Sequence, residues 1–208
     1  MEDVLDVYQR PLNPQRPLVC VDEKPVQLLA ETQPPQPPGP GRPARQDYEY
    51  HREGTANLFV AFKPLRNWRR FEVTRQRTRQ DFAAFLVELV EDRYRDAQKV
   101  VLVMDNLNTH SPASLYERLP AAQAKRIADR LEIHYTPKHG SWLNMAEIEF
   151  SVVGRRLPQR VPDASCLARH CTAIERERNR QGARVDWQFT ADQARIKLKR
   201  LYPSIQVR

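Results

Sequence analysis

The chain of 208 residues contains no apolar run that approaches the roughly 20 residues needed by a membrane-spanning helix. Its first residues are acidic and lack a basic segment followed by an apolar stretch, which argues against a secretory signal. There are only three cysteines and no Cys-x-x-Cys spacing, so neither a disulfide framework nor a cysteine-rich zinc site is expected. We therefore expect a soluble, cytoplasmic protein with reduced thiols.

The basic charge is concentrated toward the C-terminus. The net charge is +8, and residues 151–208 hold 13 basic and 5 acidic side chains, whereas residues 1–150 hold 21 of each. A basic surface suits a polyanion such as nucleic acid, because phosphates that it neutralises release their counterions. A solvated face that keeps the protein in solution explains the same excess equally well.

Apolar patterns predict an alternation of strands and helices. The predicted strands cover residues 18–22, 55–63, 68–74, 99–104 and 131–136. The predicted helices cover residues 78–95, 112–130 with a break at Pro120, 143–157, 163–180 and 191–201. The many prolines from Thr32 to Arg45 predict an exposed loop of polyproline character between two elements of one domain.

Acidic residues follow two of these strands. Asp22 and Asp105 each end a predicted strand, and a later helix carries Glu147 and Glu149. Carboxylates side by side repel each other, and their oxygen atoms favour Mg²⁺ or Mn²⁺ between them. Two such ions on one carboxylate set activate a water and stabilise the leaving oxygen of a phosphoryl displacement. The alternative interpretation is that both aspartates are ordinary turn residues, and helical spacing does not decide between the two glutamates.

Three segments resemble the acidic motifs of the DDE transposases, and the match is closest to the bacterial insertion-sequence group of the mariner superfamily. They are Cys-Val-Asp-Glu-Lys at 20–24, Val-Met-Asp-Asn-Leu-Asn-Thr-His at 103–110, and residues 134–147, which end in Leu-Asn-Met-Ala-Glu. The tail from Trp187 to Pro203 also looks like the C-terminus of that group. The resemblance covers nearly the whole chain and favours Glu147 as the third acid, so Glu149 is expected to tolerate glutamine where Glu147 does not.

The resemblance implies an α/β, ribonuclease H-like fold, which is a mixed sheet flanked by helices, with a basic helical C-terminal extension. The domain boundaries that we expect are a lead-in at 1–17, a catalytic domain at 18–160 with the proline-rich loop 32–45, and the basic extension at 161–208.

The same resemblance implies strand cleavage at insertion-sequence ends and transfer of the freed 3′ hydroxyl into target DNA. Asp22, Asp105 and Glu147 would be the catalytic residues and the ligands of two Mg²⁺ or Mn²⁺ ions. The implied partners are double-stranded DNA, as transposon ends and as target, and a second transposase subunit. No membrane partner is expected, and DNA binding would place the protein on the bacterial nucleoid.

Four basic residues are candidates for contacts with DNA. Lys24 and Lys138 lie beside motif acids in the sequence, and Arg69 and Arg70 belong to an arginine-rich hairpin. His110, five residues after Asp105, is interpreted as a cap of the following helix, with the orientation of a phosphate or a water as the alternative.

Family members of full length carry an N-terminal helix-turn-helix region, for which there is no room before residue 18. We therefore interpret the chain as a catalytic fragment of a longer enzyme. Two alternatives stay open: a ribonuclease H-like nuclease without strand transfer, and a catalytically idle remnant that only binds DNA or a partner transposase.

Overall fold

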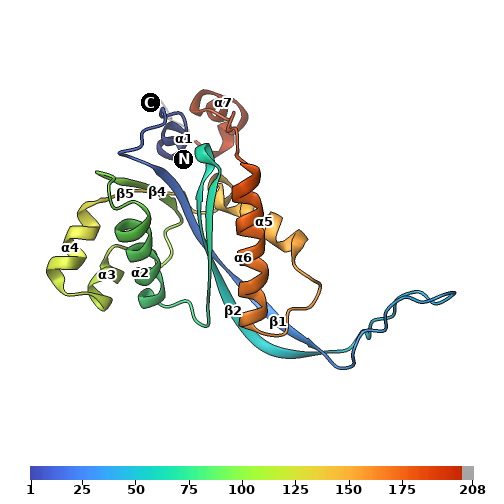
Figure 1. Cartoon of the computed structure of the whole chain (residues 1–208). Helices are drawn as coiled ribbons and strands as arrows, with labels where there is room; N and C mark the ends of the chain where they lie inside the picture. The colour runs from blue at the N-terminus through green and yellow to red at the C-terminus, as the bar shows by residue number, and fades with distance from the viewer. Residues whose placement is uncertain (203–208) are drawn as a thin grey trace.

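The computed structural model describes residues 1–202, in which a five-stranded mixed sheet has helices on both faces (Figure 1). The strands are β1 (Leu18–Glu31), β2 (Tyr50–Lys63), β3 (Trp68–Thr74), β4 (Val100–Met104) and β5 (Leu131–Tyr135). Their order across the sheet is β3-β2-β1-β4-β5. β1 is antiparallel to β2 and parallel to β4, which makes it the central strand. All five strands are predicted by the sequence.

The helices divide between two hydrophobic cores, one on each face of the sheet. One face packs against α2 (Arg79–Val87), which continues as a π-helical turn (Glu88–Arg93), and against α3 (Ala113–Arg118) and α4 (Ala121–Asp129). The other face packs against α1 (Glu2–Tyr8), α5 (Ala146–Arg156), α6 (Ala164–Gln181) and α7 (Ala191–Lys197). Short 3₁₀ turns occur at Pro64–Arg66, Ser141–Leu143 and Lys199–Leu201. Within residues 1–202 no helix has both the length and the apolar character to cross a membrane.

The first helix differs from the expected lead-in at residues 1–17. The side chains of Val4, Leu5 and Val7 are buried in the same core as α5 and α6. The hydroxyl of Tyr8 donates to the carbonyl oxygen of Leu143 at 2.6 Å, just before α5 begins. A helix of seven residues spans two turns, which is too short for its apolar spacing to stand out in the sequence.

β1 is longer than the sequence predicts. It continues past Asp22 to Glu31, because β2 pairs with it from Cys20 to Glu31. The two strands leave the body of the molecule as a ribbon whose tip is the proline-rich segment (Figure 1). Residues 33–46 of that segment are exposed, as predicted. Asp22 therefore lies within a strand rather than at its end.

A buried ion cluster fixes α5 on the sheet. Glu149 of α5 is fully buried, and its Oε2 lies 3.2 Å from Nε of Arg69 on β3. Arg178 of α6 donates to both oxygens of Glu149, at 3.0 and 2.9 Å. Arg69 is also fully buried, and its Nη1 donates to Oδ1 of Asn179 at 3.2 Å. The prediction that Arg69 contacts DNA is wrong, because this guanidinium balances the charge of a buried carboxylate.

The cluster also changes what we expect of Glu149. Glu149→Gln leaves two guanidinium groups without their full counter-charge, so we expect the free energy of unfolding to fall by about 3 kcal/mol, which is typical of breaking a buried ion pair. Glu147, two residues earlier, is exposed, and Glu147→Gln should change this quantity by less than about 0.5 kcal/mol. Urea unfolding followed by circular dichroism compares the two variants. Equal midpoints would contradict the anchoring role of Glu149.

Candidate metal centre

Asp22 and Asp105 lie level with each other where β4 ends. β1 and β4 pair in parallel over three residues, and the last pair is Cys20 with Val103. Extending this register by two residues sets Asp22 opposite Asp105. Asp105 is the first residue after β4, which ends at Met104. The short length of β4 thus places two carboxylates side by side at the centre of the sheet.

Asp22 is nearly buried on the α5 side of the sheet, with 8% of its surface exposed. Its Oδ1 accepts a hydrogen bond from the backbone N–H of Glu23 at 2.9 Å, and its Oδ2 accepts one from Nδ2 of Asn144 at 3.3 Å. Burial, and after it the negative charges of Asp105 and Glu147, raise the pKa of Asp22 to about 7. The structure thus brings the three acids named from the sequence close enough for their charges to interact.

Glu147 lies in the first turn of α5 and is exposed. The positive end of the helix dipole favours a carboxylate at this position. Asn144 lies three residues earlier and is buried; its Nδ2 also donates to the carbonyl oxygen of Val21 at 2.9 Å, and its Oδ1 accepts from the N–H of Ala146 at 3.2 Å. One amide thereby ties the start of α5 to the strand that carries Asp22.

Sequence reasoning missed this role of Asn144, although the residue is part of the Leu-Asn-x-x-Glu segment. An amide between two apolar residues just before a helix is the signal for a buried polar contact, because a buried amide needs hydrogen-bond partners.

Asp105 is held by His110, whose side chain is completely buried. Nδ1 of His110 contacts Oδ1 of Asp105, and Nε2 contacts Oε2 of Glu23. Burial by itself lowers the pKa of His110, but the hydrogen bonds and charges of the two carboxylates raise it to about 9. The bond from His110 in turn lowers the pKa of Asp105. His110 therefore contacts two carboxylates and does not cap the next helix as predicted.

The three acids fit a hard divalent cation by their chemistry. They offer only oxygen atoms, which Mg²⁺ and Mn²⁺ prefer, and a cation relieves the repulsion that raises the pKa of Asp22. Within residues 1–202 no three His, Cys, Asp or Glu side chains already form a group that holds an ion. One oxygen of Asp105 contacts His110, and the exposed side chain of Glu147 has room to move. The other oxygen of Asp105 is available to an ion, so the side chain of Glu147 is the one that we expect to move on binding.

The other basic candidates lie in different surroundings. Lys24 is exposed on β1, two residues beyond Asp22. Lys138 is exposed and lines a cavity of about 650 Å³ that also includes Asp105. Nε of Arg70 lies 3.0 Å from Oε1 of Glu88, so this guanidinium already has an acidic partner.

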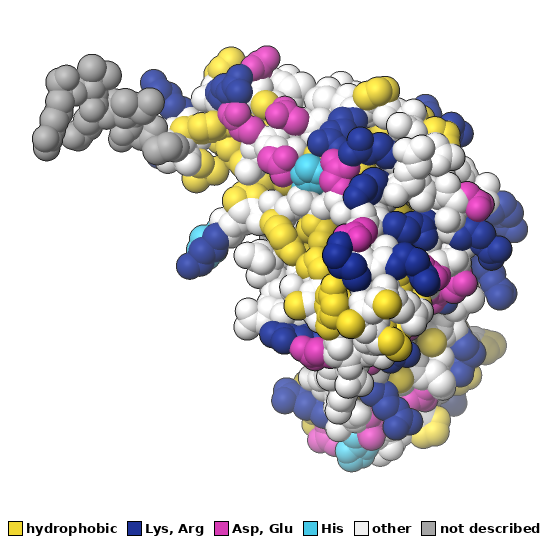
Figure 2. Space-filling model, turned by 90° about the vertical axis from the view of Figure 1, so that its left-hand side faces the viewer, with side chains coloured by type: hydrophobic (Ala, Val, Ile, Leu, Met, Phe, Trp, Pro, Cys, Tyr) yellow, Lys and Arg dark blue, Asp and Glu magenta, His cyan; other side chains and the backbone are white. Residues whose placement is uncertain are grey.

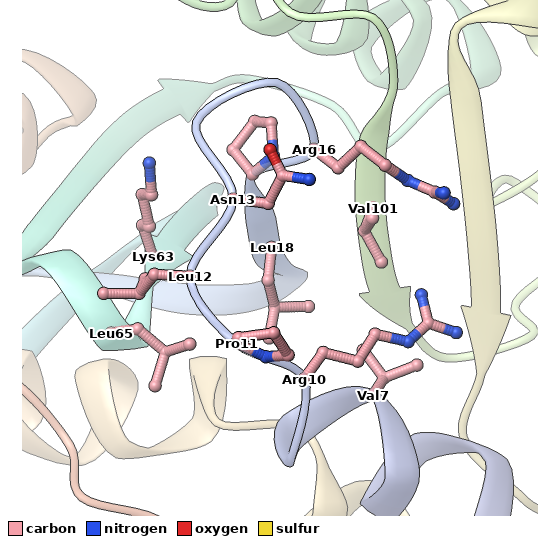
Figure 3. A pocket seen from close by; sticks show the side chains of 11 residues that line it. Val7, Arg10, Pro11, Leu12, Asn13, Arg16, Leu18, Lys63, Leu65 and Val101 are labelled. Atoms are coloured by element: carbon pink, nitrogen blue, oxygen red, sulfur yellow. The ribbon is translucent and has the colours of Figure 1, made fainter.

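A second cavity, of about 320 Å³, lies between α1 and the beginnings of β1 and β4 (Figure 3). Its apolar lining includes Val7, Leu12, Leu18, Leu65 and Val101, and its basic side chains are Arg10, Arg16 and Lys63. Both arginines pair with Glu132. This cavity lies at the N-terminal end of β1, whereas the acids follow the C-terminal end of the parallel pairing, so it does not belong to the candidate site.

The family model described as DDE superfamily endonuclease matches residues 17–167 of the chain. The structure is similar to a Mos1 strand transfer complex, with a TM-score of 0.57 and 16% identity over 86% of this chain and 53% of that chain. It is also similar to a Mos1 mariner paired end complex with Mn, with a TM-score of 0.55 and 18% identity over 86% of this chain and 54% of that one. No curated protein matches the chain.

The chain spans about half the length of those two structures. At this level of identity the similarity shows the fold, and it confirms the predicted α/β, ribonuclease H-like class.

The contacts of Asn144 lead to a prediction about stability. Asn144→Ala removes the partners of a buried carbonyl and a buried N–H, so it should lower the free energy of unfolding by about 1–3 kcal/mol. Asn144→Asp should lower it further, because a carboxylate donates nothing and adds a negative charge beside Asp22. Asn108→Asp, at an exposed position, is the control. If urea unfolding shows the same loss in the free energy of unfolding for both Asn144 variants, packing alone explains the role of this side chain.

Proposed function

This chain belongs to the DDE superfamily of endonucleases, and from that membership we propose that it is the catalytic domain of a transposase, which cuts DNA strands and joins the freed 3′ ends to target DNA. The observation that supports this most directly is the register of β1 and β4, which sets Asp22 level with Asp105. Burial, and after it the charges of Asp105 and Glu147, also raise the pKa of Asp22. We propose these three acids as the catalytic and metal-binding residues.

The proposed mechanism assigns each residue a task. The chemistry that two bound Mg²⁺ or Mn²⁺ ions would supply is a more acidic attacking oxygen and a balance for the charge on the transferred phosphoryl group. Asp22 and Asp105 would hold the ions from adjacent strands, and Glu147 would hold them from α5. Hydrogen bonds orient both aspartates in advance, which lowers the entropy lost on binding. In the proposed cleavage, water attacks a DNA phosphodiester and the 3′ oxygen leaves as the free 3′ hydroxyl. In strand transfer, that hydroxyl attacks a phosphodiester of the target and displaces the 3′ oxygen of the target strand.

The proposed partners are double-stranded DNA and a second transposase subunit. One of the similar structures is described as a Mos1 paired-end complex with a left transposon end. Lys24 and Lys138, exposed near the acids, are the residues that we propose to contact phosphates. On the side of the molecule that carries α3 and α4, basic and acidic side chains are interleaved (Figure 2). We place the main DNA contacts instead on the basic residues that follow α5, in keeping with the charge excess there.

Substitution of each acid tests the catalytic assignment. Asp22→Asn, Asp105→Asn and Glu147→Gln should each slow Mn²⁺-dependent nicking of a supercoiled plasmid at least about 100-fold, because each removes a metal ligand. Glu117→Gln, on the exposed surface of α3, should leave the rate unchanged. Wild-type nicking by any one of the three variants would remove that residue from the site.

The products separate the proposal from its two alternatives. A labelled duplex with a free 3′ hydroxyl should become joined to the plasmid if the chain is a transposase domain. Nicking without joining would favour a ribonuclease H-like nuclease. DNA binding with neither reaction would favour an idle remnant.

Salt dependence tests how the chain contacts DNA. Non-specific contacts to phosphates predict a dissociation constant of micromolar or weaker near physiological salt, and little preference for transposon ends. Deleting residues 163–208 would expose the core that Leu167 and Ile174 of α6 help to form, so point substitutions are preferable. Arg176→Gln with Arg180→Gln, both on α6, should reduce the slope of log K against log salt by about 0.9 for each phosphate that the variant no longer neutralises.

The matched control for the salt experiment is Lys125→Gln with Arg126→Gln on α4. Each of these side chains already pairs with an acid, so the slope should not change. Strong binding of an end-containing duplex that resists salt would contradict the proposal that the contacts are non-specific.

A further inference from the structure

We propose that His110 and Glu23 are positioning residues for Asp105, which hold one oxygen of its carboxylate from the far face of the sheet and leave the other oxygen for metal ions. The inference rests on the proposed function, since it assumes that Asp105 is a metal ligand. Neither His110 nor Glu23 needs to touch DNA or metal for this role.

Glu23 reaches the site from the opposite side of β1 to Asp22. Neighbouring residues of a strand point to opposite faces: Cys20 packs into the core that contains α5, and Val21 packs into the core that contains α2. The same alternation puts Asp22 on the α5 side and Glu23 on the α2 side. The side chain of Glu23 is only 2% exposed there and contacts Nε2 of His110. Two consecutive acids therefore serve one site from two faces.

His110 is fixed in place by its surroundings. Its ring packs on Phe82 of α2, with 4.6 Å between the ring centroids. Its carbonyl oxygen accepts a hydrogen bond from the hydroxyl of Tyr135 at 3.2 Å. Both ring nitrogens face carboxylate oxygens: Nδ1 is hydrogen-bonded to Oδ1 of Asp105, and Nε2 lies against Oε2 of Glu23. A ring held in this way fixes the direction of its bond to Asp105.

Asp105 needs this support more than Asp22 does. Its side chain is 39% exposed and follows a strand end, so packing alone leaves it free to change rotamer. The contact with His110 engages Oδ1, and Oδ2 remains available. At the other end of the network, Nη1 of Arg77 lies 3.3 Å from Oε1 of Glu23. Arg77 thus supplies a cationic partner to Glu23, the buried acid on the other side of the His110 ring from Asp105.

Two substitutions of His110 separate positioning from simple packing. The amide of asparagine falls near the place of Nδ1 and keeps a donor for Asp105, whereas the amide of glutamine falls near Nε2 and keeps the contact with Glu23. Each variant retains only one of the two carboxylate contacts, so a purely structural role predicts equal effects. Positioning predicts that His110→Asn binds Mn²⁺ within about threefold of wild type, and that His110→Gln binds it about 10- to 100-fold more weakly, as is typical for residues that orient a metal ligand.

The measurement is the Mn²⁺ concentration that gives half of the maximal rise in melting temperature for the full chain. Nicking provides a second measurement, because high Mn²⁺ should restore the rate of His110→Gln but not that of Asp105→Asn. If both His110 variants fail to fold, Glu23→Gln tests the positioning role instead. This variant keeps a hydrogen-bond acceptor for His110, removes the charge and does not alter Asp105. It should weaken Mn²⁺ binding several-fold. Glu117→Gln is the control and should match wild type.

Two results would overturn the proposal in distinguishable ways. If His110→Gln folds and binds Mn²⁺ as tightly as wild type, the network only stabilises the fold. If the His110 variants do not fold, wild-type Mn²⁺ affinity of Glu23→Gln would show the same. Either result would leave the proposed function intact. The absence of any Mn²⁺-dependent rise in melting temperature for the unsubstituted chain would overturn the proposed function, and this inference with it.

Discussion

Electrostatic repulsion between carboxylates collected at one point of the sheet is the constraint around which this structure is arranged. The register of β1 and β4 sets Asp22 level with Asp105, and α5 adds Glu147. Each aspartate is then oriented by a side chain from a different element: Asn144 for Asp22, and His110 for Asp105. The amide of Asn144 adds no charge beside Asp22, and the ring of His110 links Asp105 to Glu23.

The two glutamates of helix α5 have different roles. Glu147 and Glu149 are separated by two positions, which in a helix places them about 200° apart. Glu147 is exposed, and Glu149 is buried against Arg69 and Arg178. The placement of Glu147 therefore depends on a second carboxylate that takes no part in the chemistry, because the buried pair fixes the rotation of the helix about its own axis.

Sequence patterns were sufficient for the five strands and for the helices after residue 78, because apolar periodicity is a local property. The motifs named the three acids, and their role at a metal site stays a prediction. The features that the sequence did not predict depend on contacts between distant segments of the chain. The extension of β1 to Glu31 requires β2 as a partner, and the burial of Arg69 requires Glu149, 80 positions later. The contact of His110 with Glu23 joins residues that are 87 positions apart. A loop histidine and a hairpin arginine look like surface residues until those partners are known.

The buried cluster around Glu149 also constrains the order of events as the chain leaves the ribosome. Glu149 is synthesised before Arg178, which supplies two of its hydrogen bonds and lies 29 positions later on α6. Until α6 has emerged, docking α5 on the sheet would bury a carboxylate with only Arg69 beside it, at a cost of several kcal/mol. The strands can assemble earlier, since β5 ends at Tyr135. The candidate metal centre is therefore among the last parts of the nascent protein to form, after the sheet that carries Asp22.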